Sequence, residues 1–271
     1  MKERWTGERL ETFLQDQTAI EHLHRYAIAC DQAAGKKILD LACGEGYGSR
    51  LLAERADQVV GMDIDEATIR RAAARYQRPN LRFQTAAAEK IPAEAGSFDL
   101  VVSFETLEHT DNHEAMLSEI KRVLKPGGTL MLSTPEKKFY SDQTGYQNPF
   151  HKKELYESEL GELMARYFMH FQVYAQRYCT GSLLVDRTGG GLNLYRGNFE
   201  AVEKLPAVDP VYLLVIASDS LVPAIGSSVF DGSLLLDKAR QNEARAIRQT
   251  LTYRLGHIIL WPFKWVRRWI T

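Results

Sequence analysis

One short segment combines glycines and carboxylates in a pattern that suits a charged ligand. The apolar run 38–42 leads into Cys43-Gly44-Glu45-Gly46, and a glycine loop between a strand and a helix brings backbone N–H groups close to a ligand. Gly44-x-Gly46 begins a dinucleotide-binding fingerprint, but the third glycine of that fingerprint would fall at Ser49. Asp40 at the strand end and Glu45 in the loop would repel a pyrophosphate. They favour instead a ligand that carries an ammonium or sulfonium charge.

A further carboxylate suggests that this ligand contains a ribose. Asp63 ends the next apolar run, 59–63, where an acidic residue accepts hydrogen bonds from ribose hydroxyls. A ribose beside a cationic, phosphate-free group describes S-adenosylmethionine better than NAD. The sequence therefore predicts S-adenosylmethionine as the cofactor.

Two histidines could take a proton from a methyl acceptor. Methyl transfer from a sulfonium is an in-line displacement, in which the protein aligns the reactants and, for a hydroxyl acceptor, removes a proton. His109 follows the apolar run 99–103, and His151 follows the run 129–133 at the same expected sheet edge. Either could be the catalytic base. His109 could instead fix its loop, and His151 could cap the next helix.

The surroundings of the two histidines suggest an acceptor site without a metal. The polar and aromatic segment 140–147 is loop-like and is expected to cover the acceptor. The acidic pairs of this region lack the Asp/Asn cluster that would hold magnesium. The sequence therefore predicts a metal-independent enzyme.

Short apolar runs and helical stretches form the frame that must position these residues. The runs expected to be strands are 38–42, 59–63, 81–85, 99–103, 129–133, 171–178 and 211–217. Continuous apolar strands, each followed by a helix, indicate a parallel sheet covered on both faces. We expect an α/β domain over 1–230, with an N-terminal helix at 8–34 and an insert at 179–208. A helical appendage is expected over 231–271.

The ordered motifs together resemble the class I S-adenosylmethionine-dependent methyltransferases, a Rossmann-like family. The matching segments are 38–46, 59–65, 97–105 and 122–128. The resemblance implies a seven-stranded, mostly parallel sheet in which 171–178 and 211–217 form an antiparallel hairpin at one edge. Segments 24–26, 42–48, 104–109 and 148–151 look similar to methyltransferases of bacterial surface-polysaccharide (O-antigen) gene clusters. There the acceptor is typically a sugar hydroxyl or a sugar-linked phosphate.

The resemblance also implies roles for individual residues. Gly44 and Gly46 would back the methionine moiety, while Asp63 and Ile64 would hold the ribose and the adenine edge. Many relatives carry an aspartate where this chain has Ala87, so the adenine amino group would need another partner. The residues expected to bind the cofactor are Arg25, Tyr26, Asp40, Gly44, Gly46, Tyr47, Asp63, Ile64, Ala87, Ala88, Glu89, Phe104 and Glu105. Arg25 and Tyr26 would reach the cofactor carboxylate from the N-terminal helix, or belong to a salt-bridged helix face.

Other functions remain open at this point. The acceptor could be a lipid-soluble small molecule such as a quinone precursor instead of a glycan. The chain could also be a non-catalytic cofactor-binding subunit. A nicotinamide dehydrogenase is disfavoured by Asp40 and Ser49.

Charge and composition limit the partners. The 271 residues include 34 Lys+Arg and 35 Asp+Glu, for a net charge of −1, which argues against a nucleic-acid-binding surface. The three cysteines are widely spaced, so a reducing, cytoplasmic location is expected. We therefore expect neither a secretory signal nor a bilayer-spanning helix.

The C-terminal tail, residues 251–271, differs from the rest of the chain. Trp261, Trp265 and Trp269 recur every four residues, and residues 240–271 carry seven Lys/Arg against one Glu. A basic amphipathic helix with tryptophans is typical of a helix that lies on an anionic membrane surface. Docking on the domain itself or on a second copy in a homo-oligomer is the alternative. The cytoplasmic protein could thus be peripheral at the inner face of the membrane.

Overall fold

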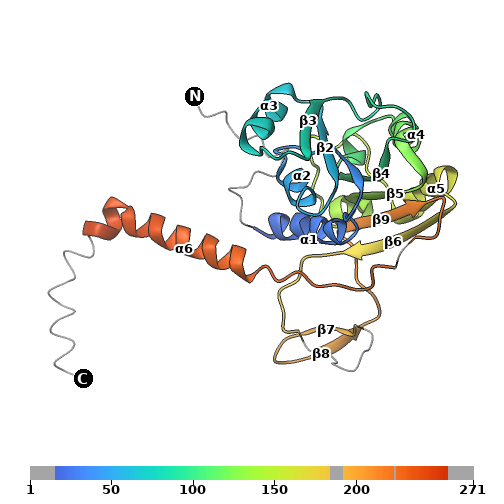
Figure 1. The fold of residues 1–271 in the computed structure, drawn as a ribbon. Coiled ribbons are helices and arrows are strands. Elements are labelled where there is room, and N and C mark those ends of the chain that lie inside the picture. The colour runs from blue at the N-terminus through green and yellow to red at the C-terminus, as the bar shows by residue number, and fades with distance from the viewer. Residues whose placement is uncertain (1–15, 184–191, 223, 256–271) are drawn as a thin grey trace, which may run out of the picture.

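A seven-stranded sheet with helices on both faces forms the body of the protein (Figure 1). The computed structural model describes residues 16–183, 192–222 and 224–255. The strands are β1 (Lys37–Leu41), β2 (Gln58–Asp63), β3 (Leu81–Thr85), β4 (Phe98–Phe104), β5 (Leu124–Pro135), β6 (His170–Gln176) and β9 (Tyr212–Ser218). Their order across the sheet is β3-β2-β1-β4-β5-β9-β6.

The pairing confirms the predicted mostly parallel sheet with an antiparallel edge. The pairs β1–β2, β1–β4, β2–β3 and β4–β5 are parallel, whereas β9 runs antiparallel to both β5 and β6. Strands β6 and β9 thus form the expected antiparallel pair. Strand β9 lies between β5 and β6, and β6 is the edge strand. The chain has the predicted Rossmann-like α/β fold.

The helices are α1 (Gln17–Asp31), α2 (Tyr47–Leu52), α3 (Glu66–Arg75), α4 (His113–Val123), α5 (Glu157–Tyr167) and α6 (Ser233–Gln249). Helices α1 and α2 pack on one face of the sheet, and α4 and α5 pack on the other. Successive residues of β1 point to opposite faces: Ile38 packs in the core with α1 and α2, and Leu39 packs in the core with α4 and α5. Burial on both faces explains why the central strands β1, β4 and β9 are almost continuously apolar.

The first helix differs in part from the sequence expectation of 8–34. Residues 8–15 lie outside the described part of the chain. The Asp16 side chain accepts a hydrogen bond from the Ala19 N–H at 3.1 Å and caps a helix that begins at Gln17. Such a cap stabilises a helix start, because it satisfies one of the N–H groups that lack a partner in the first turn.

Two features of the C-terminal half lie outside the sheet. The predicted insert 179–208 contains a hairpin that the sequence did not predict, formed by β7 (Leu194–Gly197) and β8 (Val202–Leu205). Helix α6 begins at Ser233, close to the predicted start, has no buried residue, and extends away from the sheet (Figure 1).

The division of the chain into two domains at residue 230 stays a prediction. In the described part of the chain, no helix has the length and apolar character needed to cross a bilayer.

Candidate functional site

The carboxyl ends of the central strands open into a cavity of about 430 Å³. In an open α/β sheet the ligand crevice lies at this edge, where the strand order reverses. In this sheet the strand order reverses between β1 and β4. The predicted residues that line the cavity are Tyr26, Gly44, Tyr47, Asp63, Ile64, Ala88, Glu89, Phe104, Glu105, His109 and His151. The structure therefore brings most of the predicted site residues together around one space.

The glycine loop uses its two glycines differently. Gly44 lines the cavity at φ +51°, and a Cβ built there would meet nothing within 4 Å. Gly46 has φ +76°, but its Cβ would lie 2.7 Å from the Phe83 ring. Gly46 does not line the cavity, so the expectation that it backs the ligand is corrected: it allows the loop to pack against β3.

Asp63 holds the loop in place from the end of β2. Its carboxylate accepts hydrogen bonds from the Gly44 N–H at 3.0 Å and the Asp65 N–H at 2.9 Å. Ile64 follows it and is 69% exposed. Both residues line the cavity, in the position where the sequence expects a ribose and an adenine edge.

Asp40 does not face the cavity, and this corrects the expectation that it meets the ligand. Its side chain is 1% exposed and accepts hydrogen bonds from the Tyr26 hydroxyl at 3.1 Å and the Ser49 hydroxyl at 2.6 Å. Burial raises the pKa of Asp40 to about 7. Through its hydrogen bonds with Tyr26 and Ser49, the Asp40 carboxyl group links α1 to the start of α2 behind the loop.

Arg25 is a third correction, because it is 1% exposed and is absent from the cavity lining. Its guanidinium donates to Gln176 Oε1 at 2.7 Å and lies 3.6 Å from a Glu105 oxygen. Tyr26, the next residue, does line the cavity and packs edge-on against Phe104. Arg25 therefore acts within the protein core, and only Tyr26 reaches the predicted ligand space.

Tyr47 lines the cavity from the start of α2. Its hydroxyl lies 3.0 Å from the Nδ1 atom of His22 on α1. Burial lowers the pKa of His22 well below its ordinary value, with the nearby Arg25 charge acting in the same direction. A neutral imidazole therefore stands beside Tyr47 at neutral pH.

The loop after β3 contributes Ala86, Ala88 and Glu89 to the wall, but not Ala87. Ala87 forms a bridge with Lys90 instead, so the expected position of Ala87 at the ligand is corrected. Glu89 accepts a hydrogen bond from the Thr110 hydroxyl at 2.5 Å. This contact ties the wall to the loop that follows β4.

The end of β4 places Glu105 in the wall by means of an unusual backbone. Glu105 has φ +54°, a left-handed conformation that is uncommon outside glycine and clusters at functional sites. Ser133 donates to its carboxylate at 2.6 Å. Phe104, one residue earlier, faces the same cavity.

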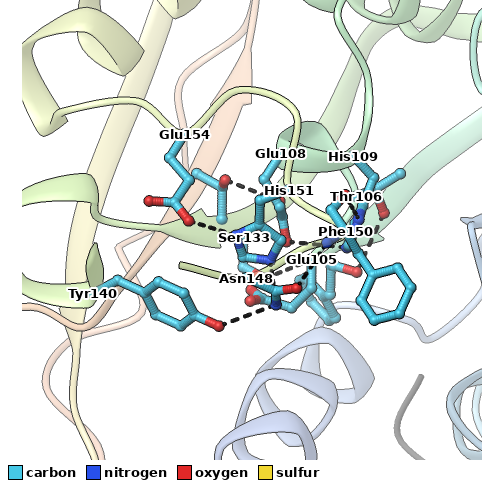
Figure 2. A network of polar contacts seen from close by, with 12 residues as sticks. Glu105, Thr106, Glu108, His109, Ser133, Tyr140, Asn148, Phe150, His151 and Glu154 are labelled. Atoms are coloured by element: carbon cyan, nitrogen blue, oxygen red, sulfur yellow. Dashed lines mark hydrogen bonds and ion pairs between the residues drawn. The ribbon is translucent and has the colours of Figure 1, made fainter. Parts of the chain in front are cut away.

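His151 belongs to a hydrogen-bonded chain that includes a carboxylate (Figure 2). Its Nδ1 atom lies 2.5 Å from Glu154 Oε1, and its Nε2 atom lies 3.0 Å from Asn148 Nδ2. Since a carboxylate oxygen only accepts, Nδ1 carries the proton and Nε2 carries the lone pair. Nε2 is therefore the basic atom of this ring.

His109 lies next to His151, with ring centroids 5.1 Å apart. Its Nδ1 atom donates to the Phe150 carbonyl oxygen at 3.0 Å, and its Nε2 atom lies 3.8 Å from Glu108 Oε1. Burial, and then the nearby Glu105 charge, raise the pKa of Glu108 well above its ordinary value. Both predicted histidines thus meet at the same end of the cavity.

Some residues of this end are not assigned a role by the sequence. Glu154 lies three residues after His151, in the segment that precedes α5, and its carboxylate meets the His151 ring. Tyr212 lines the cavity from the start of β9, and no local signal marks it. A short π-helical turn, Lys138–Asp142, overlaps the start of the loop expected over 140–147 and brings Tyr140 onto the His151 ring, with centroids 5.3 Å apart.

The charges around the cavity favour a cation. Its described lining includes six carboxylic acids and no lysine or arginine; the acids are Asp16, Glu45, Asp63, Glu89, Glu105 and Glu108. Arg71 lies 3.1 Å from Glu45 and Arg25 lies 3.6 Å from Glu105, so these two arginines balance part of the negative charge. The wall as a whole still disfavours phosphate and favours ammonium or sulfonium groups. It fits the predicted cofactor better than a dinucleotide.

The comparisons with known proteins agree with this chemistry. Residues 39–132 match a family model described as "Methyltransferase domain". A probable S-adenosylmethionine-dependent methyltransferase of Mycolicibacterium smegmatis is 38% identical over 162 residues, which cover 59% of this chain and 62% of that protein. A ubiquinone biosynthesis O-methyltransferase of Psychrobacter arcticus is 37% identical over 106 residues, covering 37% of this chain and 41% of that protein. The match thus spans less than two thirds of either relative.

Among solved structures, an S-adenosylmethionine-dependent methyltransferase from Mesorhizobium loti shares the fold. The TM-score is 0.53 at 19% identity, over 73% of this chain and 97% of that chain. At this identity the similarity concerns the fold.

Proposed function

We propose that this protein, which carries a class I S-adenosylmethionine-dependent methyltransferase domain, transfers a methyl group to a hydroxyl of a lipid-soluble acceptor. One observation carries the proposal: a single cavity joins Asp63 and Gly44 at one end with the His109–His151 pair at the other. A cofactor and an acceptor in that space would meet end to end, as in-line transfer requires.

The first end of the cavity suits the cofactor. When bound there, S-adenosylmethionine supplies an electrophilic methyl group on a sulfonium. Gly44 leaves room for close approach, Asp63 offers carboxylate oxygens to hydroxyl groups, and the acidic wall favours the cation.

The other end suits a hydroxyl acceptor. Its O–H proton would pass to Nε2 of His151, whose lone pair faces the Asn148 amide at 3.0 Å. The acceptor would have to replace that amide contact. Glu154 would then stabilise the imidazolium through Nδ1.

Aromatic side chains near the histidines support a lipid-soluble, planar acceptor. Tyr140 packs against the rings of Tyr146 and Tyr212 at 5.8 Å between centroids in each case. Aromatic faces bury apolar rings well, and one relative is named for ubiquinone biosynthesis.

A sugar hydroxyl or sugar phosphate of a bacterial cell-surface glycan is the second candidate. The tyrosines and Asn148 that line this end would also suit a carbohydrate face. The relatives reported above are not named for polysaccharide synthesis.

A labelled-methyl assay tests the proposal. The protein is incubated with S-adenosylmethionine labelled in the methyl group and, in parallel, with a prenylated catechol and a lipid-linked sugar. Transfer to the catechol hydroxyl is expected, and transfer only to the sugar would select the glycan function. Calorimetric binding of NAD without any binding of S-adenosylmethionine would overturn both.

A further inference from the structure

Three side chains point toward one another at the acceptor end of the cavity (Figure 2). One carboxylate oxygen of Glu108 and one ring nitrogen each of His109 and His151 all lie within 4.8 Å of one another. Two imidazoles and a carboxylate are the donor set with which proteins hold zinc and other divalent transition metals while leaving coordination positions open. We propose that these three side chains bind one divalent transition-metal cation that also contacts the acceptor hydroxyl.

The hydrogen bonds around the two imidazoles support this assignment. Nδ1 of His109 donates to the Phe150 carbonyl oxygen at 3.0 Å, and Nδ1 of His151 donates to Glu154 Oε1 at 2.5 Å. In metal sites the ligating histidine typically donates its other N–H to a carbonyl or a carboxylate, which fixes the tautomer and the ring orientation. Both rings therefore present Nε2 as the ligating atom.

Glu108 is an independent observation that points to a cation. Its side chain is 1% exposed, it lines the cavity, and its Oε2 atom accepts from the Thr134 hydroxyl at 3.0 Å. Within the described residues, its Oε1 atom has no hydrogen-bond partner. A buried carboxylate oxygen without a donor is costly, and a cation at this point would satisfy it.

Two adjustments accompany binding. Tetrahedral ligands about 2.1 Å from a zinc ion lie about 3.4 Å apart, whereas Glu108 Oε1 and His109 Nε2 are 3.8 Å apart. The ligand atoms must therefore move inward. The cation would also take the place of the Asn148 amide, which lies 3.0 Å from His151 Nε2.

The inference rests on the proposed methyl transfer and changes how the proton leaves. A hydroxyl bound to a divalent cation loses its proton more readily, so the proton would pass to water and His151 would be a ligand instead of a base. The oxygen then forms the new O–C bond while the C–S bond breaks and its electron pair goes to sulfur. The sequence predicted a metal-independent enzyme because the chain lacks an acidic cluster for magnesium. The site proposed here consists instead of two histidines and one glutamate.

Metal binding is measured first and without any turnover. The untagged full chain is treated with chelator, dialysed, and titrated with Co²⁺ by visible absorption and with Zn²⁺ by calorimetry. One equivalent per chain is expected. Replacements His109→Gln, His151→Gln and Glu108→Gln should each weaken binding at least about 100-fold, and Glu154→Gln about 10- to 100-fold.

The matched control is His170→Gln, an exposed histidine at the start of β6, which should bind metal like the wild type. Circular dichroism and S-adenosylmethionine affinity verify that each variant folds. Absence of a stoichiometric site, or equal binding by the His151→Gln and His170→Gln variants, would overturn the inference.

Different results would overturn the proposed methyl transfer and the proposed metal site. Cation binding without S-adenosylmethionine binding would overturn the methyltransferase function and leave the metal site intact. Methyl transfer that continues undiminished in the chelator-treated protein would overturn the catalytic role of the cation.

Discussion

Asp40 and Asp63 are both aspartates near the ends of neighbouring strands, yet their surroundings differ. Asp63 lines the cavity and accepts backbone N–H groups, whereas Asp40 is enclosed by Tyr26 and Ser49. Both carboxylates lie on the same face of the sheet, because Asp40 pairs with Gly61 and side chains alternate along a strand, but Asp63 lies two residues further toward the carboxyl end. The position along the strand, set by the register between the neighbours, therefore decides which carboxylate reaches the cavity.

Replacing Asp40 with Asn should flatten the pH dependence of stability. Burial raises its pKa from 3.8 to about 7, so the folded state holds a proton that the unfolded state releases. The stabilisation is full below the unfolded pKa and is lost as the pH rises through the folded pKa. From about pH 5 to about pH 8, the melting temperature of the wild type should fall relative to that of the Asp40→Asn variant. Parallel curves over this interval would contradict the raised pKa.

Two glycines of one loop give a matched pair of alanine substitutions. Both have positive φ, where a non-glycine residue costs about 1–2 kcal/mol. Gly44→Ala should lose only that amount, since its Cβ meets open space. Gly46→Ala should lose about 1–3 kcal/mol more, because its Cβ would overlap the Phe83 ring. Urea unfolding of the ligand-free protein measures both, and equal losses would mean that the packing against β3 is unimportant.

At the scale of elements, a glutamine of the edge strand helps to hold α1 against the far edge of the sheet. Gln176 of β6 donates to the Glu21 carbonyl oxygen at 3.0 Å and accepts from Arg25 at 2.7 Å. Helix α1 also supplies His22 and Tyr26 to the cavity. The edge strand thus supports the wall of a site to which it contributes no side chain.

Gln176→Ala should therefore loosen α1. The loss of two hydrogen bonds from partly buried groups is expected to cost about 1–3 kcal/mol. Amide hydrogen exchange over residues 17–31 should become faster, and S-adenosylmethionine affinity should fall. Gln172→Ala, an exposed glutamine of the same strand, serves as the control; similar exchange rates in the two variants would exclude this role.

At the scale of the whole molecule, the net charge of −1 is an average over unlike parts. The cavity wall is acidic, whereas residues 240–271 carry seven Lys/Arg and one Glu. Helix α6 exposes Leu234 and Ile247, and the predicted amphipathic segment with its three tryptophans lies outside the described residues. Membrane contact by the tail stays a prediction of the sequence.

A vesicle assay tests that contact. The full chain should sediment with phosphatidylglycerol vesicles more than with phosphatidylcholine vesicles, and added salt should weaken the binding, because the attraction to anionic lipid is electrostatic. A variant with Gln at Lys264, Arg267 and Arg268 should lose this preference. If the variant and the wild type sediment alike, the tail has another role, such as docking on a second copy.

The sequence by itself determined the parts of this protein that depend on local pattern. Continuous apolar strands predicted the parallel sheet, and the glycine loop with Asp63 predicted one part of the cavity wall. The sequence also predicted that His109 and His151 lie at the same sheet edge, although they are far apart along the chain, because both follow strands that end there.

Only the tertiary structure decided which of these side chains reach the cavity. Arg25 and Asp40 turn into the core because β6 and α1 enclose them, and Tyr212 enters the site because β9 pairs beside β5. Glu108, His109 and His151 converge through three separate contacts, with Thr134, Phe150 and Glu154. The contacts with Thr134 and Phe150 join segments far apart in the chain, which no local spacing encodes, whereas Glu154 lies only three residues from His151.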